Sequence, residues 1–275
     1  MSAAPNVPDN RLLAALPAGD YERLQPYLEW VALEFKQLLF EVDAPIEHVY
    51  FPENLVVSIL AVMPDGSAVE VATAGREGMV GLPVFLGSES MSAQAFVQVP
   101  GHAWRMSAGA LREHSQRSEK LRAVLERYTQ ALFTQVSQGS ACNRLHSIEE
   151  RCARWLLMTQ DRVGASKFPL TQQFLSQMLG VRRAGVSEVA STLQSEGLIR
   201  YSRGHVTIVD RERLEAAACE CYGIIRREFD RLLDGGQSRG VAPVKVSQTS
   251  EEGRSTLGDG SPRPRRKSPR RKART

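Results

Sequence analysis

The hydrophobic pattern changes at Ser107, and this change constrains the fold of the 275-residue chain more than any other feature. From Val31 to Met106, short apolar, β-branched and aromatic runs alternate with turn residues, which is typical of closely spaced antiparallel strands. Beyond Ser107, apolar residues recur three and four positions apart, as on one face of a helix. The pattern predicts an α+β chain in which an N-terminal antiparallel β-roll, jelly-roll-like, precedes helices.

The β-roll is expected to contain six strands, at residues 33–40, 48–51, 56–62, 69–73, 95–99 and 103–106. The sequence Met63-Pro64-Asp65-Gly66 predicts a tight turn, because proline fixes one φ angle and glycine permits a positive one. Residues 10–27 precede the strands and are expected to form short helices packed on the sheet.

A long helix is expected over residues 107–143, and it carries one apolar stripe. Spacings of four, three and four residues place these members on one face: Leu121, Leu125, Tyr128 and Leu132. The stripe either packs on the core of its own chain or forms a dimerisation seam between two copies. Its length favours the seam.

Ser147 and Glu150 have the spacing of a capping box, so a new helix is expected to begin there.

Cys152 lies on the apolar face of that helix, which favours a core residue over a reactive thiol. Cys219 and Cys221 could bind a metal or oxidise, but neighbours at this spacing on a helix point about 200° apart. The four cysteines are expected to be reduced, and no metal site is predicted.

Residues 168–193 predict two helices joined by a tight turn. Thr171 can cap the first helix, and Gly180 permits the positive φ that the turn needs. The apolar residues that bury the pair are Phe174, Leu175, Met178, Val181, Val186, Val189 and Leu193. This is the pattern of a helix-turn-helix, although the pattern alone also fits a helical hairpin that binds no nucleic acid.

Polar residues stay on the outer face of the second helix, where the major groove of double-stranded DNA could receive them. Residues 195–209 then predict two short strands, a wing whose arginines lie beside phosphates. The predicted DNA-binding residues are Thr171, Gln172, Arg182, Arg183, Ala184, Ser187, Glu188, Arg200 and Arg203.

At these residues the chain resembles the Crp/Fnr family of bacterial transcription regulators. The resemblance extends from about residue 12 to 217 and is most specific at Leu179-Gly180-Val181-Arg182-Arg183 and Ser195-Glu196-Gly197-Leu198-Ile199. It implies a β-roll sensor domain with N-terminal helices (1–106), a dimerisation helix (107–143) and a winged helix-turn-helix DNA-binding domain (144–234). It also implies a homodimer that reads two half-sites and contacts RNA polymerase.

The resemblance also assigns roles within the recognition helix, which would start at Arg182. Arg183 falls where the family commonly places an arginine that contacts guanine. Ala184 and Glu188 stand where the family often has Glu and Arg. A DNA site different from the best-known one is therefore expected.

Family members that bind a cyclic nucleotide carry a Gly-Glu pair and an Arg-Ser/Thr-Ala run in the β-roll. Here Leu82 follows Gly81, and no arginine lies between Glu77 and Ala103. A buried phosphate would have no charged partner, so neither cyclic AMP nor cyclic GMP is expected to bind. The β-roll either holds an unknown uncharged ligand or none, and the candidate ligand pocket comprises Glu77, Gly81, Leu82, Phe85 and Tyr128.

Other cofactors and catalysis are not predicted. No cysteine precedes Cys142, whereas the iron–sulfur members of the family place theirs mostly at the N-terminus. His48 and His102 could serve haem, but a lone histidine on a strand more often has a structural role. They also form no close histidine pair with a carboxylate, and the common hydrolase and phosphate-loop motifs are absent from the sequence. The chain is not expected to be an enzyme.

The net charge of +4 is unevenly distributed. Residues 235–275 contain 11 Lys/Arg and 3 Asp/Glu, which leaves 24 basic and 28 acidic residues before them. These last residues are expected to form a disordered basic tail, either dispensable or able to bind any DNA. The alternative function is accordingly a ligand-binding or protein-interaction module whose DNA binding is non-specific and comes from the tail.

Without a leader or a spanning apolar run, a cytoplasmic protein with no membrane partner is expected.

Overall fold

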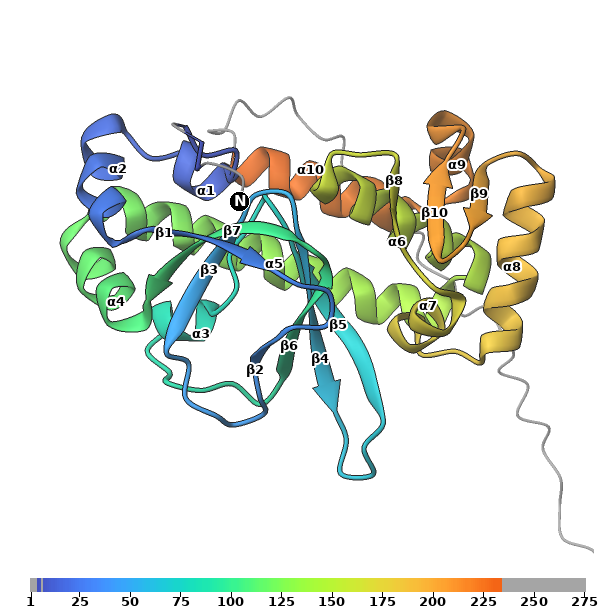
Figure 1. Ribbon diagram of the computed structural model, residues 1–275, viewed down its shortest axis with the longest axis horizontal. Coiled ribbons are helices and arrows are strands. Elements are labelled where there is room, and N and C mark those ends of the chain that lie inside the picture. The colour runs from blue at the N-terminus through green and yellow to red at the C-terminus, as the bar shows by residue number, and fades with distance from the viewer. Residues whose placement is uncertain (1–3, 6, 234–275) are drawn as a thin grey trace, which may run out of the picture. The chain divides into compact units, whose positions relative to one another are not determined.

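The computed structural model describes residues 4, 5 and 7–233, and its first half contains two antiparallel sheets (Figure 1). One sheet has the strand order β1 (Glu29–Leu33), β7 (Gly101–Ser107) and β3 (His48–Pro52). The other has the order β2 (Leu38–Phe40), β6 (Gln94–Val99), β4 (Val56–Val62) and β5 (Ala68–Ala74). Buried side chains of both sheets belong to one hydrophobic core. The predicted N-terminal β domain is confirmed.

The strand predicted over residues 33–40 is wrong, because these residues form the end of β1, a turn and the whole of β2. Lys36 has φ +64°, which a strand residue does not adopt. The backbone N–H of Gln37 donates to the Glu34 carbonyl at 3.1 Å and closes the turn. The turn predicted at residues 63–66 is confirmed: Gly66 has φ +82° and donates to the Met63 carbonyl at 2.9 Å.

Short helices precede and interrupt the strands. These are α1 (Arg11–Ala14), α2 (Ala18–Leu24), the 3₁₀ turn η1 (Gln25–Tyr27) and α3 (Leu82–Phe85). The long helix expected over residues 107–143 is two helices, α4 (Ala108–Arg117) and α5 (Glu119–Leu145). Ser118 separates them with an extended backbone, and its hydroxyl accepts from the N–H of Leu121 at 3.1 Å as the cap of α5.

The apolar stripe of α5 packs on its own chain. Leu121, Leu125 and Tyr128 are at most 2% exposed, so the seam interpretation is wrong for these three residues. The C-terminal helix covers part of the stripe, since the ring of Phe229 lies 6.3 Å from that of Tyr128. The spacing of a stripe shows which residues share a face but not what covers them. Leu132 is partly buried, whereas Phe133 beside it is 68% exposed.

The second half is helical apart from one small sheet. Its helices are α6 (Ile148–Val163), α7 (Gln172–Leu179), α8 (Arg183–Ser195), α9 (Arg211–Ala217) and α10 (Glu220–Leu233). The sheet has the order β8 (Lys167–Pro169), β10 (His205–Ile208) and β9 (Ile199–Ser202). The predicted capping box begins α6: the N–H of Glu150 donates to Ser147 Oγ at 3.2 Å, and the N–H of Ser147 donates to Glu150 Oε2 at 2.8 Å.

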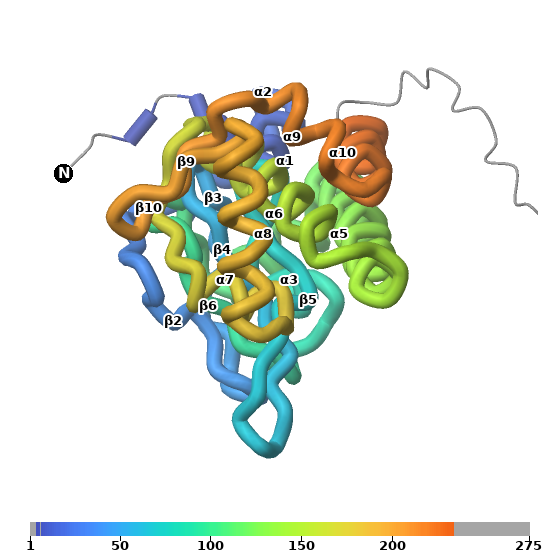
Figure 2. Tube along the Cα trace, turned by 90° about the vertical axis from the view of Figure 1, so that its right-hand side faces the viewer, coloured from blue at the N-terminus to red at the C-terminus, as the bar shows by residue number. Residues whose placement is uncertain are grey.

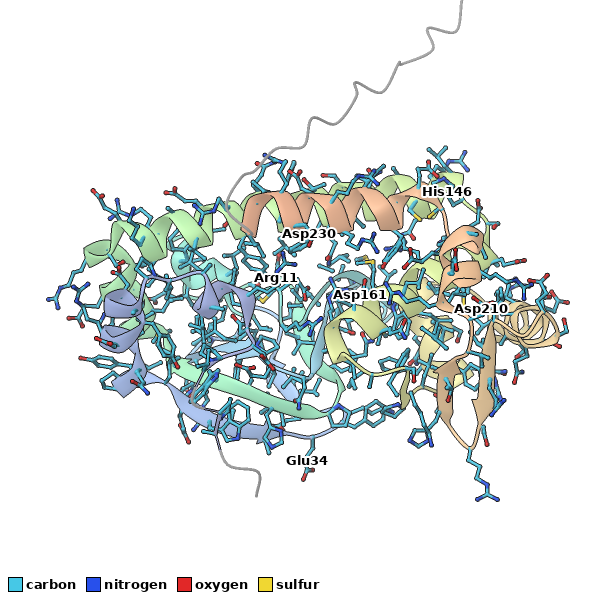
Figure 3. The ribbon with its side chains drawn as sticks, turned by 90° about the horizontal axis from the view of Figure 1, so that it is seen from above. Arg11, Glu34, His146, Asp161, Asp210 and Asp230 are labelled. Carbon is cyan, nitrogen blue, oxygen red and sulfur yellow. The ribbon has the colours of Figure 1, made fainter. Side chains whose placement is uncertain are left out.

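Helix α10 runs back along α5, towards the N-terminal helices (Figures 1 and 3). Its apolar face is buried and includes Tyr222, Ile225, Phe229 and Leu233. Near its end, Asp230 forms an ion pair with Arg11 at 3.1 Å. The last described helix therefore packs on elements that come much earlier in the chain.

No helix within residues 4, 5 and 7–233 is both long and apolar enough to cross a membrane. The tail predicted to be disordered and basic, residues 235–275, lies outside the described residues. The described residues all fall within one compact unit.

We expect Phe229→Ala to lower the free energy of unfolding by about 3–5 kcal/mol, because it leaves a cavity between α10 and α5. Denaturant unfolding followed by circular dichroism measures this change. Leu86→Ala is the control, because Leu86 is 61% exposed and surface truncations stay within about 0.5 kcal/mol. Equal stability of the two variants would contradict the packing of α10 described above.

Candidate nucleic-acid interface

The turn between α7 and α8 is built by local chemistry. The N–H of Phe174 donates to Thr171 Oγ1 at 3.1 Å, which caps α7 as predicted. At the other end Gly180 has φ +62°, a left-handed conformation that favours glycine. The N–H of Val181 then donates to the Ser176 carbonyl at 3.0 Å, and Arg182 serves as the N-cap residue of α8.

The start of α8 presents polar side chains to solvent. Arg182, Arg183, Ala184 and Glu188 are exposed. Ser187 is half-buried, and its hydroxyl lies 2.8 Å from Gln172 Oε1 and 3.1 Å from the Arg183 carbonyl. In the part of the chain that the structure describes, no ion pair joins Arg183 to Glu188, so the guanidinium can reach a base edge.

The predicted wing is the hairpin of β9 and β10. Its two-residue turn is Arg203-Gly204, with φ +48° and +76°, and positive φ at both positions suits the right-handed twist of a tight hairpin. Arg200 and Arg203 are both exposed. β9 packs beside α8, and the two elements lie together at the end of the molecule away from β1–β3 (Figures 1 and 2). The predicted DNA-binding residues thus share one region.

Aromatic rings join α7 to the β domain. The ring of Phe174 lies 5.8 Å from that of Phe35 and 5.8 Å from that of Phe96, the second contact edge to face. A Cβ on Gly180 would stand 3.2 Å from the Val69 side chain of β5. The turn of the helix-turn-helix therefore rests on the sheet, which the sequence did not predict.

A polar network also joins α6 to the sheet. Glu70 of β5 accepts from Trp155 Nε1 at 2.9 Å and from Ser58 Oγ at 2.7 Å. Gln98 Nε2 donates to Thr159 Oγ1 at 3.3 Å. Removal from water disfavours the charged carboxylate and raises the pKa of Glu70 to about 7.

A buried ion pair lies nearby. Arg162 Nε donates to Glu77 Oε1 at 2.6 Å, and both side chains are nearly inaccessible. Arg162 also donates to Gln135 Oε1 at 2.8 Å, and Gln135 Nε2 donates to the Thr73 carbonyl at 3.0 Å. Gly75 makes room for the pair, because a Cβ there would lie 2.5 Å from Arg162 Cγ.

The residues of the predicted ligand pocket are divided between two places. Glu77 faces Arg162 and lines a hollow of about 480 Å³ between the β domain and α10. Leu82 and Tyr128 are buried in the core. The Tyr128 hydroxyl donates to the Met79 carbonyl at 2.8 Å, and a Cβ on Gly78 would meet its ring at 2.5 Å. A pocket for an uncharged ligand at these residues stays a prediction.

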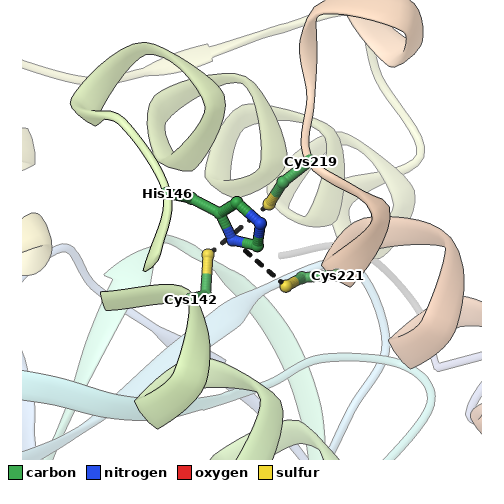
Figure 4. Close-up of side chains that lie close together, drawn as sticks. All are labelled: Cys142, His146, Cys219 and Cys221. Carbon is green, nitrogen blue, oxygen red and sulfur yellow. Dashed lines mark hydrogen bonds between the residues drawn. The ribbon is translucent and has the colours of Figure 1, made fainter. Parts of the chain in front are cut away.

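Three cysteines and a histidine gather at the junction of α5 with α10 (Figure 4). The expectation that Cys219 and Cys221 share a helix and point apart is wrong, because α9 ends at Ala217 and α10 begins at Glu220. Cys219 lies in the break, so its thiol turns to the same point as that of Cys221. Cys142 and His146, from the end of α5, complete the group. These four side chains could hold a metal ion.

Cys152 lies elsewhere in the main core. It is 1% exposed, and burial raises its pKa to about 12. This agrees with the prediction of an unreactive core thiol.

Comparison with models of protein families identifies a known domain in each half of the chain. Residues 150–217 match the model of the Crp-like helix-turn-helix domain, and residues 30–118 match that of the cyclic nucleotide-binding domain. The chain belongs to the Crp/Fnr family. As a member, it is a DNA-binding transcription regulator and not an enzyme, as predicted.

Solved structures of the Crp/Fnr family share the fold at low sequence identity. FixK2 from Bradyrhizobium japonicum has a TM-score of 0.60 and 17% identity, covering 70% of this chain and 98% of that one. A Crp/Fnr-family transcriptional regulator from Eubacterium rectale has a TM-score of 0.58 and 17% identity, covering 75% and 96%. A CRP-family regulator from Thermus thermophilus has a TM-score of 0.57 and 18% identity, covering 69% and 96%. A comparison with curated protein sequences gives no match.

Glu70 generates a pH prediction. Because its pKa in the folded chain lies above the ordinary 4.5, the neutral carboxyl stabilises the fold below about pH 4.5, and this contribution is lost as the pH rises through about 7. Relative to Glu70→Gln, which cannot ionise, the wild type should lose at most about 3 kcal/mol of unfolding free energy over that range. Denaturant unfolding at a series of pH values tests this, with Glu22→Gln on the exposed face of α2 as control. A wild-type curve parallel to that of Glu70→Gln would contradict the assignment.

Proposed function

We propose that this regulator binds specific DNA sequences as a homodimer, with α8 in the major groove and the β9–β10 wing on the flanking backbone. The observation that carries the proposal is the exposed set at the start of α8, above all Arg183, beside a wing that bears Arg200 and Arg203. Arg183 supplies a bidentate donor to guanine, and the wing arginines neutralise phosphates. Thr171 and Gln172 at the start of α7 contact the backbone or support α8.

Glu188 distinguishes the DNA site of this regulator. A carboxylate one turn after Ala184 on α8 accepts from the amino group of cytosine. It repels phosphate and offers no donor to guanine. The preferred half-site therefore combines a guanine read by Arg183 with a cytosine nearby.

The second copy packs against the exposed side of α5. Phe133 is 68% exposed and Val136 is 36% exposed, and together with the partly buried Leu132 they form an apolar strip that the other described residues leave at least partly uncovered. A dimer formed along this strip places two α8 helices for two half-sites, as dimeric helix-turn-helix proteins require. Its targets place it in the bacterial cytoplasm, where it contacts RNA polymerase as the family does.

The β domain of this member takes no cyclic nucleotide. Residues 78–102 contain no arginine to pair with a cyclic phosphate. The buried Arg162 is already paired with Glu77 and bonded to Gln135. An uncharged ligand or the abundance of the protein then sets its activity.

Arg183→Ala should weaken binding to the preferred site by roughly 10- to 100-fold and relax the preference at one base pair. Selection from a library of random duplexes gives the preferred site, and fluorescence anisotropy at two salt concentrations gives the Kd values. Arg112→Ala on α4 is the matched control, and its affinity for the preferred site should not change.

Arg203→Ala should weaken binding to all sequences and reduce the salt slope by about one. Binding without a preferred sequence and indifferent to Arg183 would instead favour a module that binds DNA non-specifically through its tail.

Phe133→Glu should weaken dimerisation by at least about tenfold, because it places a charge in an apolar contact. Sedimentation velocity over a range of protein concentrations measures the dimer. Leu86→Glu is the control, since Leu86 is similarly exposed but lies outside α5. A dimer of unchanged strength in Phe133→Glu would show that another surface joins the two copies.

A further inference from the structure

Four potential metal ligands converge at one point that the DNA-binding function does not use. The Sγ atoms of Cys142, Cys219 and Cys221 and a ring nitrogen of His146 all lie within 4.8 Å of one another. The three thiols are at most 4% exposed and form a small buried cluster separate from the main hydrophobic core. A hydrophobic role explains the burial of a thiol but not the direction of the imidazole.

Helix geometry brings the ligands together in pairs. Cys142 lies in the last turn of α5 and His146 is its C-cap residue, whose N–H donates to the Cys142 carbonyl at 3.1 Å, so the two residues lie close together. Cys219 precedes α10 and Cys221 lies in its first turn. The residue before Cys219, Ala218, is extended, with ψ 152°, which breaks the helix and allows both thiols to face α5.

The distances approach those of a tetrahedral centre. Cys142 Sγ lies 3.5 Å from Cys219 Sγ, and Cys221 Sγ lies 3.6 Å from His146 Nδ1. In a tetrahedron with metal–sulfur bonds of about 2.3 Å, neighbouring ligand atoms are about 3.8 Å apart. The group therefore needs only small side-chain adjustments to enclose an ion.

The second ring nitrogen of His146 is held in the way that a ligating histidine requires. His146 Nε2 lies 3.3 Å from Glu220 Oε1, while Nδ1 faces the thiols. A carboxylate that accepts from the far nitrogen fixes the tautomer and leaves the near nitrogen free to donate its lone pair to a metal. Glu220 is exposed and stands between two of the cysteines in the sequence.

Two arginines of α6 place positive charge near the same group of ligands. Three thiolates around a divalent ion carry a net charge of −1. The charges of Arg151 and Arg154 act on Cys142 from the neighbouring helix. The side-chain Nε atoms of both arginines are buried and have no hydrogen-bond acceptor among the described residues. Sulfur atoms of a negatively charged centre would be natural neighbours for them.

We propose that Cys142, His146, Cys219 and Cys221 bind Zn²⁺ in a closed structural centre. Three sulfurs and one nitrogen are a common tetrahedral ligand set for zinc, and four protein ligands leave no position for substrate. On binding, the three thiols release their protons to water and His146 remains neutral, so no oxidant is needed. The ion fastens the end of α5 to the start of α10 and so closes a loop that contains the whole helix-turn-helix.

A disulfide between Cys142 and Cys219 is the competing explanation for their proximity. It would use two of the four groups and would leave Cys221 and His146 without a role. It would also need an oxidant. The test below separates the two.

The full chain, prepared without a polyhistidine tag and under reducing conditions, should contain about one zinc ion per chain by elemental analysis. Exchange of zinc for Co²⁺ should give the intense visible bands of tetrahedral cobalt together with thiolate charge-transfer absorption. This readout needs no mutation and does not depend on DNA binding. Failure of the reduced chain to bind Zn²⁺ or Co²⁺, or a Cys142–Cys219 disulfide in metal-free protein, would overturn the proposal.

Variants identify the ligands. Cys142→Ala and Cys221→Ala should lose the bound ion and the cobalt bands, whereas Cys152→Ala, which also removes a buried thiol, should retain both. Glu220→Gln should lower zinc affinity by roughly 10- to 100-fold, the usual effect of removing an outer carboxylate. A chelator should lower the Tm of the wild type and of Cys152→Ala but not that of Cys142→Ala. Equal zinc content in Cys142→Ala and Cys152→Ala would contradict the assignment.

Discussion

The buried ion pair between Arg162 and Glu77 fixes how the helical half sits on the β domain. Removing two charges from water costs several kcal/mol per ion unless good geometry and further hydrogen bonds compensate. Arg162 meets this requirement through Glu77, Gln135 and the Met158 carbonyl, 3.2 Å away. Displacement of α6 would leave charges buried without partners. The bonds of Arg162 therefore hold α5, α6 and the segment after β5 to one another.

That segment follows β5, which contacts α5 and α7 and is hydrogen-bonded to α6 through Glu70. Val69 lies at the helix-turn-helix turn, Glu70 binds Trp155, and Thr73 accepts from Gln135. Gly75 and Glu77 then receive Arg162. A change in the twist or position of β5 would therefore alter contacts with both α6 and α7.

The parts of the site that the sequence predicts are those made by neighbours in the chain. The Thr171 cap, the positive φ of Gly180 and the wing turn depend on local backbone preferences, so residue types at fixed spacing reveal them. The metal-ligand group depends on contacts between residues 77 positions apart, and no local pattern reports them. The sequence contained two signals, a Cys-x-x-x-His spacing at the end of α5 and a Cys-x-Cys pair before and in α10, each weak alone. The turn at Lys36 was not predicted, because the apolar residues on both sides of it have the pattern of one continuous strand.

The path of α10 changes how the protein can be divided. By sequence it belongs to the C-terminal half, yet Ile225, Phe229 and Leu233 are buried in a face that packs on α5. A fragment cut after α5 would keep α10 but lose the surface that covers it. The boundary between the halves in sequence is thus not a boundary between autonomous folding units. An isolated DNA-binding fragment of this regulator would carry an exposed apolar helix and tend to aggregate.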